Sequence, residues 1–116
     1  MNYVVRTGMT TWDYLTASFT RDGNIYSKNV SAIVPVDAQM IKCRVYVKGD
    51  AVGSSIIFGG PSVTTITEMA GIRTSYISDY WDLIVDIPVE GQQSFKYRAS
   101  SVNISTLNMI ILGWWL

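Results

Sequence analysis

Apolar and polar side chains alternate along most of this chain with a period of two residues. Residues 40–48 place four apolar side chains on one side: Ile41, Cys43, Val45 and Val47. Residues 81–87 do the same, with carboxylates on the other side: Trp81, Leu83, Val85 and Ile87. Successive side chains of an extended strand point to opposite faces, so the pattern predicts strands with one inward and one solvated face.

The same alternation, less regular, continues in shorter stretches at residues 10–19, 29–34, 54–58, 62–67 and 94–99. Clusters of Gly, Pro, Asp and Asn separate the stretches and are typical of turns. One or two turns of helix are expected around residues 67–73. About eight short strands at this spacing predict an all-β fold, an antiparallel, jelly-roll-like β-sandwich that forms a single domain over residues 1–116.

One short pattern occurs twice, as VPVDAQMIKCRV at residues 34–45 and as IPVEGQQSFKYR at residues 87–98. Each copy has a Pro near the end of an apolar strand, then an acid-small-Gln turn and a new strand. Proline lacks the N–H that a strand ladder needs, so it is tolerated at strand margins. Because the Lys and Arg that follow fall on outward positions, we interpret the repeat as a corner of the scaffold.

The C-terminal segment, ISTLNMIILGWWL from residue 104, loses the alternation, so that both sides of a strand would be apolar from Met109 onward. A strand of a two-layer sandwich buries only one face. Leaving a pair of Trp side chains in water would cost several kcal/mol. We therefore expect a contact between subunits formed by five residues: Met109, Ile111, Trp114, Trp115 and Leu116. The alternative is that one Trp closes this subunit's own core while the other lies flat on its surface.

Composition limits the chemistry that this chain can perform. Nine basic residues balance nine acidic ones, which gives no electrostatic reason to expect nucleic acid or an anionic membrane as a partner. Histidine is absent and Cys43 is the one cysteine, which removes intramolecular disulfides, thiolate metal clusters and the commonest general base. We therefore expect no enzyme, no metal and no other cofactor. Charged residues make up only 16% of the chain, so we expect part of the surface to be covered.

Aromatic residues beside carboxylates are the remaining candidate chemistry. Asp82 and Asp86 would lie about 13 Å apart along a strand, too far for the carboxylate pair of a glycoside hydrolase. Trp and Tyr offer flat contact area to a sugar ring, and nearby carboxylates can bind its hydroxyls. The candidate sugar platform consists of four residues: Trp12, Tyr14, Asp79 and Tyr80. Packing in the core is the alternative explanation for these rings.

The repeated Pro corner and a final strand that runs into Gly-Trp-Trp resemble the small β-sandwich domains of phage structural proteins. Head fibres, decoration proteins and tail appendages contain such domains. The resemblance implies a non-enzymatic homo-oligomer, a trimer or dimer, within a larger virion assembly, with a host-surface glycan as a candidate ligand. No secretion signal and no membrane span are recognisable, so we expect the protein to be made in the host cytoplasm and to join the virion. A small carbohydrate-binding module or lectin is the alternative from a different class.

Overall fold

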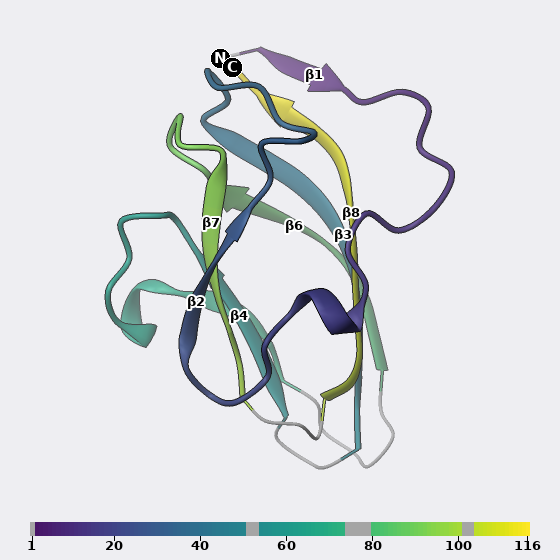
Figure 1. Cartoon of the computed structure of the whole chain (residues 1–116), viewed down its shortest axis with the longest axis vertical. Coiled ribbons are helices and arrows are strands. Elements are labelled where there is room, and N and C mark those ends of the chain that lie inside the picture. The colour runs from purple at the N-terminus through teal and green to yellow at the C-terminus, as the bar shows by residue number, and fades with distance from the viewer. Residues whose placement is uncertain (1, 51–53, 74–79, 101–103) are drawn as a thin grey trace.

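The structure is a computed structural model that describes residues 2–50, 54–73, 80–100 and 104–116 (Figure 1). In these residues the chain forms eight strands and two short 3-10 turns. The strands are β1 (Tyr3–Val5), β2 (Ile25–Asn29), β3 (Met40–Gly49), β4 (Ser55–Gly59), β5 (Ala70–Arg73), β6 (Tyr80–Pro88), β7 (Ser94–Ala99) and β8 (Ile104–Trp115). The 3-10 turns are η1 (Thr16–Ser18) and η2 (Ile66–Glu68).

The strands form two four-stranded antiparallel sheets that pack face to face, in the orders β1-β8-β3-β6 and β2-β7-β4-β5. The first strand pairs with the last, β2 with β7, β3 with β6, and β4 with β5. The chain is therefore one long antiparallel ribbon, with its tip between β4 and β5, rolled into two layers. This is the strand order of a jelly roll, so the prediction of an antiparallel, jelly-roll-like sandwich is confirmed.

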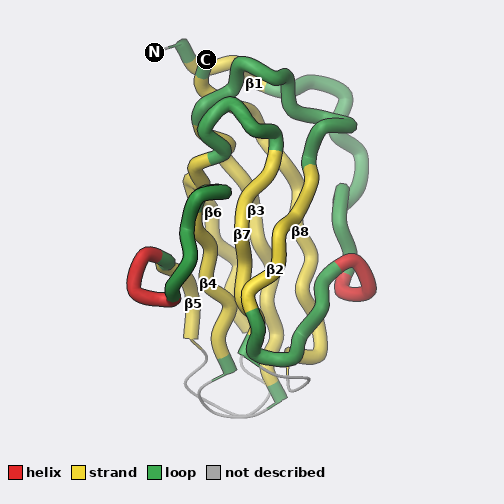
Figure 2. The backbone as a smooth tube through the Cα atoms, turned by 60° about the vertical axis from the view of Figure 1, so that its left-hand side comes forward, coloured by secondary structure: helices red, strands yellow, loops and turns green. Residues whose placement is uncertain are grey.

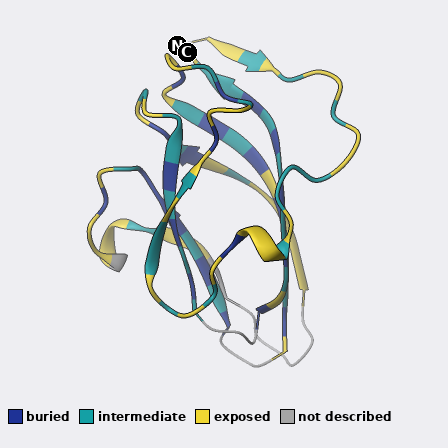
Figure 3. Cartoon of the chain, in the orientation of Figure 1, coloured by how far each residue is buried: buried dark blue, intermediate teal, exposed yellow. Residues whose placement is uncertain are grey.

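Buried and less buried residues alternate along the strands (Figure 3), and the core forms where the buried side chains of the two sheets meet. The inward side of residues 40–48 is buried as predicted. Neighbouring β8 and the facing strands β4 and β7 supply most of the other large buried side chains: Ile56, Phe95, Ile104, Leu107, Met109 and Ile111. Each such side chain contributes about 1.5–3 kcal/mol relative to leaving it in water. The cluster joins both sheets into one core.

The two Pro corners contact each other at one end of the sandwich. The backbone N–H groups of Val89 and Glu90 donate to the carbonyl oxygen of Gln39 at 2.9 and 3.0 Å. The N–H of Gly91 donates to the carbonyl oxygen of Ala38 at 2.9 Å. In a rolled ribbon the β2–β3 and β6–β7 connections run side by side, so similar sequences make similar corners. The interpretation of the repeat as scaffold agrees with these bonds.

Several of the short predicted elements are wrong. Residues 10–19 contain η1 and a single bridge from Tyr14, not a strand. Residues 29–34 form a turn after the end of β2, and residues 62–67 form turns and the start of η2. Residues 67–73, where a turn or two of helix was expected, contain the end of η2 at Glu68 and then the strand β5. These segments are held by contacts with distant strands, which local alternation does not reveal.

Gly113 lies in β8 where β1 crosses close beside it. A Cβ atom at this position would meet the carbonyl oxygen of Val4 and the hydroxyl of Tyr3. We expect Gly113→Ala to lower the free energy of unfolding by about 1–3 kcal/mol, because β1 has to move away. Chemical denaturation measures this loss. Gly60→Ala is the control, since its Cβ would meet only the carboxylate end of the Glu90 side chain, and a Gly113→Ala protein as stable as this control contradicts the expectation.

Candidate functional site

Strand β8 lies inside its own sheet, between β1 and β3, and contains a β-bulge. Gly113 pairs with Lys42 and Ile111 pairs with Cys43, so Leu112 is an extra residue with no partner in β3. One extra residue in a strand reverses which side chains face the core. The loss of alternation at the C-terminus therefore has a cause within the chain.

The bulge determines which of the residues predicted to contact another subunit are buried in the core. Met109 and Ile111 face the core before the bulge and are fully buried there, so their assignment to a subunit interface is wrong. After the bulge Trp114 takes over the inward phase, opposite Ile41, and packs half-buried against the same core. Of the two C-terminal Trp side chains, this one is therefore covered by the chain itself.

The other Trp lies on the outer face of the sheet. The ring of Trp115 packs against Tyr3 with ring centroids 4.7 Å apart, and the Lys42 ammonium lies 5.3 Å from the Trp115 ring. Leu116 is exposed at the end of the chain. One Trp on the core and one flat on the surface is the alternative that the sequence left open. A subunit contact at Trp115 and Leu116 stays a prediction.

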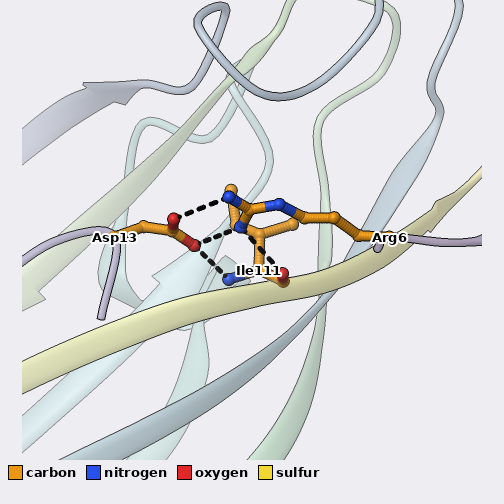
Figure 4. A network of polar contacts seen from close by, with 3 residues as sticks. All are labelled: Arg6, Asp13 and Ile111. Carbon is orange, nitrogen blue, oxygen red and sulfur yellow. Dashed lines mark hydrogen bonds and ion pairs between the residues drawn. The ribbon is translucent and has the colours of Figure 1, made fainter. Parts of the chain in front are cut away.

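Beyond the end of β1, an ion pair rather than a strand binds the outer edge of β8 at Ile111 (Figure 4). The guanidinium of Arg6 donates to both carboxylate oxygens of Asp13, at 2.5 and 2.9 Å, and to the carbonyl oxygen of Ile111 at 3.0 Å. Asp13 accepts the N–H of Ile111 at 2.8 Å. The two side chains are only 21% and 10% exposed. They bind the backbone of Ile111 as a neighbouring strand would, which makes this network structural.

Three aromatic side chains gather on the outer face of the β3 sheet. We call Trp12, Tyr46 and Tyr80 the aromatic row. The rings of Tyr46 and Tyr80 are stacked with centroids 5.7 Å apart, and Trp12 lies 6.4 Å from Tyr46. Arg44 lies over the Trp12 ring at 5.1 Å and makes two hydrogen bonds to Asp82, at 2.8 and 2.6 Å. These bonds hold the pKa of the Asp82 carboxyl below its usual value.

The structure therefore brings together two of the four residues of the predicted sugar platform. Trp12 and Tyr80 belong to the aromatic row, and Tyr46, which links them, was missed. Tyr14 packs instead against Phe19, with ring centroids 6.4 Å apart, and under the Lys28 ammonium. Burial raises the pKa of the Tyr14 phenol and places it with the core. Asp79 lies outside the described residues.

A depression lies beside the aromatic row. It has a volume of about 370 Å³ and is lined by Met9, Thr10, Thr11, Trp12, Arg44 and Ile110. Hydroxyls, a guanidinium and an indole are groups that can contact the hydroxyls and the apolar face of a sugar.

The β1–β2 connection covers one open side of the sandwich, where it runs beside β2 and β8 (Figure 2), whereas no described element covers the opposite side. The β1–β2 connection buries Phe19, which is 4% exposed, and the N–H of Thr20 donates to the Tyr97 hydroxyl at 2.8 Å. At the opposite side, between β6 and β5, Trp81 is 37% and Leu83 38% exposed. Both were predicted to be buried core positions. Their phase is correct, because they pair with Val47 and Val45, but no described strand of the second sheet covers them.

A cleft marks this uncovered side. It has a volume of about 440 Å³ and reaches between the sheets, with apolar lining residues that include Phe58, Ala70, Leu83, Val85 and Ile87. Ile84 and Tyr80, on the other face of β6, are 63% and 62% exposed. Strand β6 therefore carries apolar side chains on both faces at the edge of its sheet. We call residues 80–87 the β6 edge.

The described residues offer little reactive chemistry. Cys43 is buried in the core, and burial raises the pKa of its thiol well above the ordinary value, so the thiolate that would react is not formed. No group of three or more Cys, Asp or Glu side chains in the described part of the chain is arranged to hold a metal ion. No helix among the described residues is long and apolar enough to cross a membrane.

Comparison with known proteins adds no relative: no family model matches the sequence, and no curated protein matches it significantly.

Removal of the Asp13 carboxylate tests the role of the Arg6–Asp13 ion pair. We expect Asp13→Ala to lower the free energy of unfolding by about 1–3 kcal/mol, because the Ile111 N–H and the Arg6 guanidinium both lose their partner. Asp13→Asn is the matched control, since its amide oxygen still accepts the Ile111 N–H, and a smaller loss is expected. Urea unfolding compares the three proteins. Equal stability of Asp13→Ala and the unaltered protein would show that the pair does not hold this edge.

Proposed function

We propose that this protein is a non-enzymatic structural subunit of a larger particle, as a virion decoration or appendage protein is, and that its copies associate with one another. The observation that carries the proposal is the β6 edge. It takes the place of Met109 and Ile111 as the surface for association, since these two residues are buried in the chain's own core.

The four strands at the sheet edges differ in length and charge, and so in how readily another strand could pair with them. Edges β1, β2 and β5 have three, five and four residues, and β2 carries Lys28. Strand β6 has nine residues, no Lys, and a Pro only at its last position. Native proteins keep exposed edge strands short or charged, since a long apolar edge is a template for another chain. The β6 edge carries two carboxylates, Asp82 and Asp86, but it departs from this rule in its length and in its exposed apolar side chains. Such a departure is expected of a strand that another chain covers.

The fold agrees with this class of function. Eight-stranded jelly rolls occur in viral capsid proteins and in lectins. A fold by itself does not determine function, so the choice between these classes depends on the surface. The β6 edge favours assembly, and the resemblance of the Pro corners and the Gly-Trp-Trp end to phage structural proteins adds to it.

A second candidate function is glycan binding, and the aromatic row favours it. Trp12, Tyr46 and Tyr80 present aromatic surface on one sheet face, with the Arg44–Asp82 pair beside it. A virion subunit that also touches a host-surface glycan would combine the two functions, and a lectin would have only the second.

The molar mass of the purified protein, measured by light scattering at several concentrations, tests the assembly function. We expect a mass of two or three chains, because the cost of exposing the β6 edge is removed by association. A single-chain mass at every concentration overturns the proposal. The genes beside this one test the kind of particle, since capsid or tail genes are expected there.

A glycan array tests the second candidate. If the aromatic row binds sugar, Trp12→Ala is expected to abolish the signal, because the indole is the one ring of the row that lines the depression. Tyr3→Ala is the matched control, since Tyr3 lies on the same outer face beside Trp115, away from the row. No signal for the unaltered protein, or equal loss in both variants, counts against glycan binding at this place.

A further inference from the structure

We propose that the β6 edge pairs, antiparallel, with the β6 edge of a second copy across a two-fold axis at Leu83. This inference rests on the proposed assembly function and names its partner and its register. The pairing would join the two β3 sheets into one continuous sheet.

The direction of the backbone groups follows from the neighbouring strands. Met109 exchanges both backbone hydrogen bonds with Tyr14, at 2.9 and 3.0 Å, on the side of β8 that faces away from β3. Its partner in β3, Val45, therefore directs its own groups toward β6, where it lies opposite Leu83. Leu83 thus bonds inward, and the alternate residue Ile84 directs its N–H and C=O outward.

The same alternation turns the backbone groups of four residues outward: Tyr80, Asp82, Ile84 and Asp86. No described residue pairs with them on that side. A second antiparallel strand would bond to these four, so that even-numbered residues of one copy lie opposite even-numbered residues of the other. This restricts the two-fold registers to a small set, and charge separates them.

An axis at Leu83 places Asp82 opposite the partner's Ile84 and Asp86 opposite the partner's Tyr80. No like charges then meet. An axis at Ile84 would set Asp82 opposite the partner's Asp86 and Tyr80 opposite the partner's Pro88, which has no N–H to donate. Like charges directly opposite destabilise a strand pair.

The adjoining registers are worse for the same reasons. An axis at Asp82 sets that carboxylate opposite its own copy, and an axis at Val85 sets Asp82 opposite the partner's Pro88. An axis at Trp81 or Asp86 leaves at least two of the four outward residues with no partner among them. The axis at Leu83 pairs all four with one another and sets no carboxylate opposite another.

This register also covers the exposed apolar side chains. On the core-facing side, Leu83 meets its own copy and Trp81 lies opposite the partner's Val85. Val85 lines the 440 Å³ cleft, so the Trp81 indole of each copy would lie at the cleft of the other copy. The side of the sandwich that the described residues leave uncovered is then closed by a second copy, and the contact is the same for both copies, as a two-fold interface requires.

Cysteine cross-linking tests the register. In the proposed pair, the two Leu83 residues form a non-hydrogen-bonded pair with Cα atoms about 4.5 Å apart, within reach of a disulfide. We expect Leu83→Cys to give a covalent dimer on mild oxidation, seen on a non-reducing gel. Ile84→Cys is the matched control and is expected to stay uncoupled, because it lies opposite the partner's Asp82. The native Cys43 is buried, so the unaltered protein is the blank.

Two further variants keep the test independent of the introduced thiol. Ile84→Asp is expected to shift the molar mass to that of one chain, because it sets a second carboxylate directly opposite the partner's Asp82. Trp81→Ala is expected to weaken association at least tenfold. Val36→Asp is the control, since Val36 is similarly exposed but lies in the β2–β3 corner. A monomeric unaltered protein overturns both proposals. An oligomer that Leu83→Cys does not cross-link, that Ile84→Cys links, or that Ile84→Asp leaves intact overturns only the β6 pairing.

Discussion

Every strand at the margin of a sheet has backbone N–H and C=O groups that need partners, and the structure depends on how each margin meets this need. At β8 the chain uses β1, then the Arg6–Asp13 pair, then the backbone of Tyr14. The ion pair binds the backbone of Ile111 in place of a strand, so the loop between Arg6 and Asp13 does not have to run beside β8. No described residue bonds to the outward backbone groups of β6. Trp81 and Leu83 are also exposed, so the packing of side chains between the sheets ends at this strand.

Much of the fold could be predicted from the sequence because β3 is buried on one face only. Its alternation is regular, and the paired Pro corners mark where strands change layers. The short strands β1 and β5 could not be predicted, since three or four residues carry too little pattern. They exist because β8 and β4 offer them partners: Gly71, for instance, lies directly against the backbone of Ile56, where no side chain would fit.

The surface was harder to predict than the core. A single extra residue, Leu112, exchanges the roles of the two C-terminal Trp side chains, and nothing in the local sequence places a bulge there. The aromatic row needs the β3–β6 register, which brings Tyr46 next to Tyr80, although the outward phase of Tyr46 was visible in residues 40–48. Trp81 had the correct phase, but its exposure depends on how far the opposite sheet extends, a property of the whole roll.

Because the ribbon is closed by its two ends, Tyr3 pairs with Trp115 and the N–H of Leu116 donates to the carbonyl oxygen of Asn2 (Figure 1). Nearly all strand pairs other than β4–β5 join segments distant in sequence. In a topology of such high contact order, the chain loses the entropy of loop closure before the stabilising contacts form. Chains of this kind fold in milliseconds to seconds rather than microseconds. The apolar β6 strand therefore stays accessible to other chains for as long as folding lasts. How soon a partner covers this strand then matters as much as the contact that finally forms.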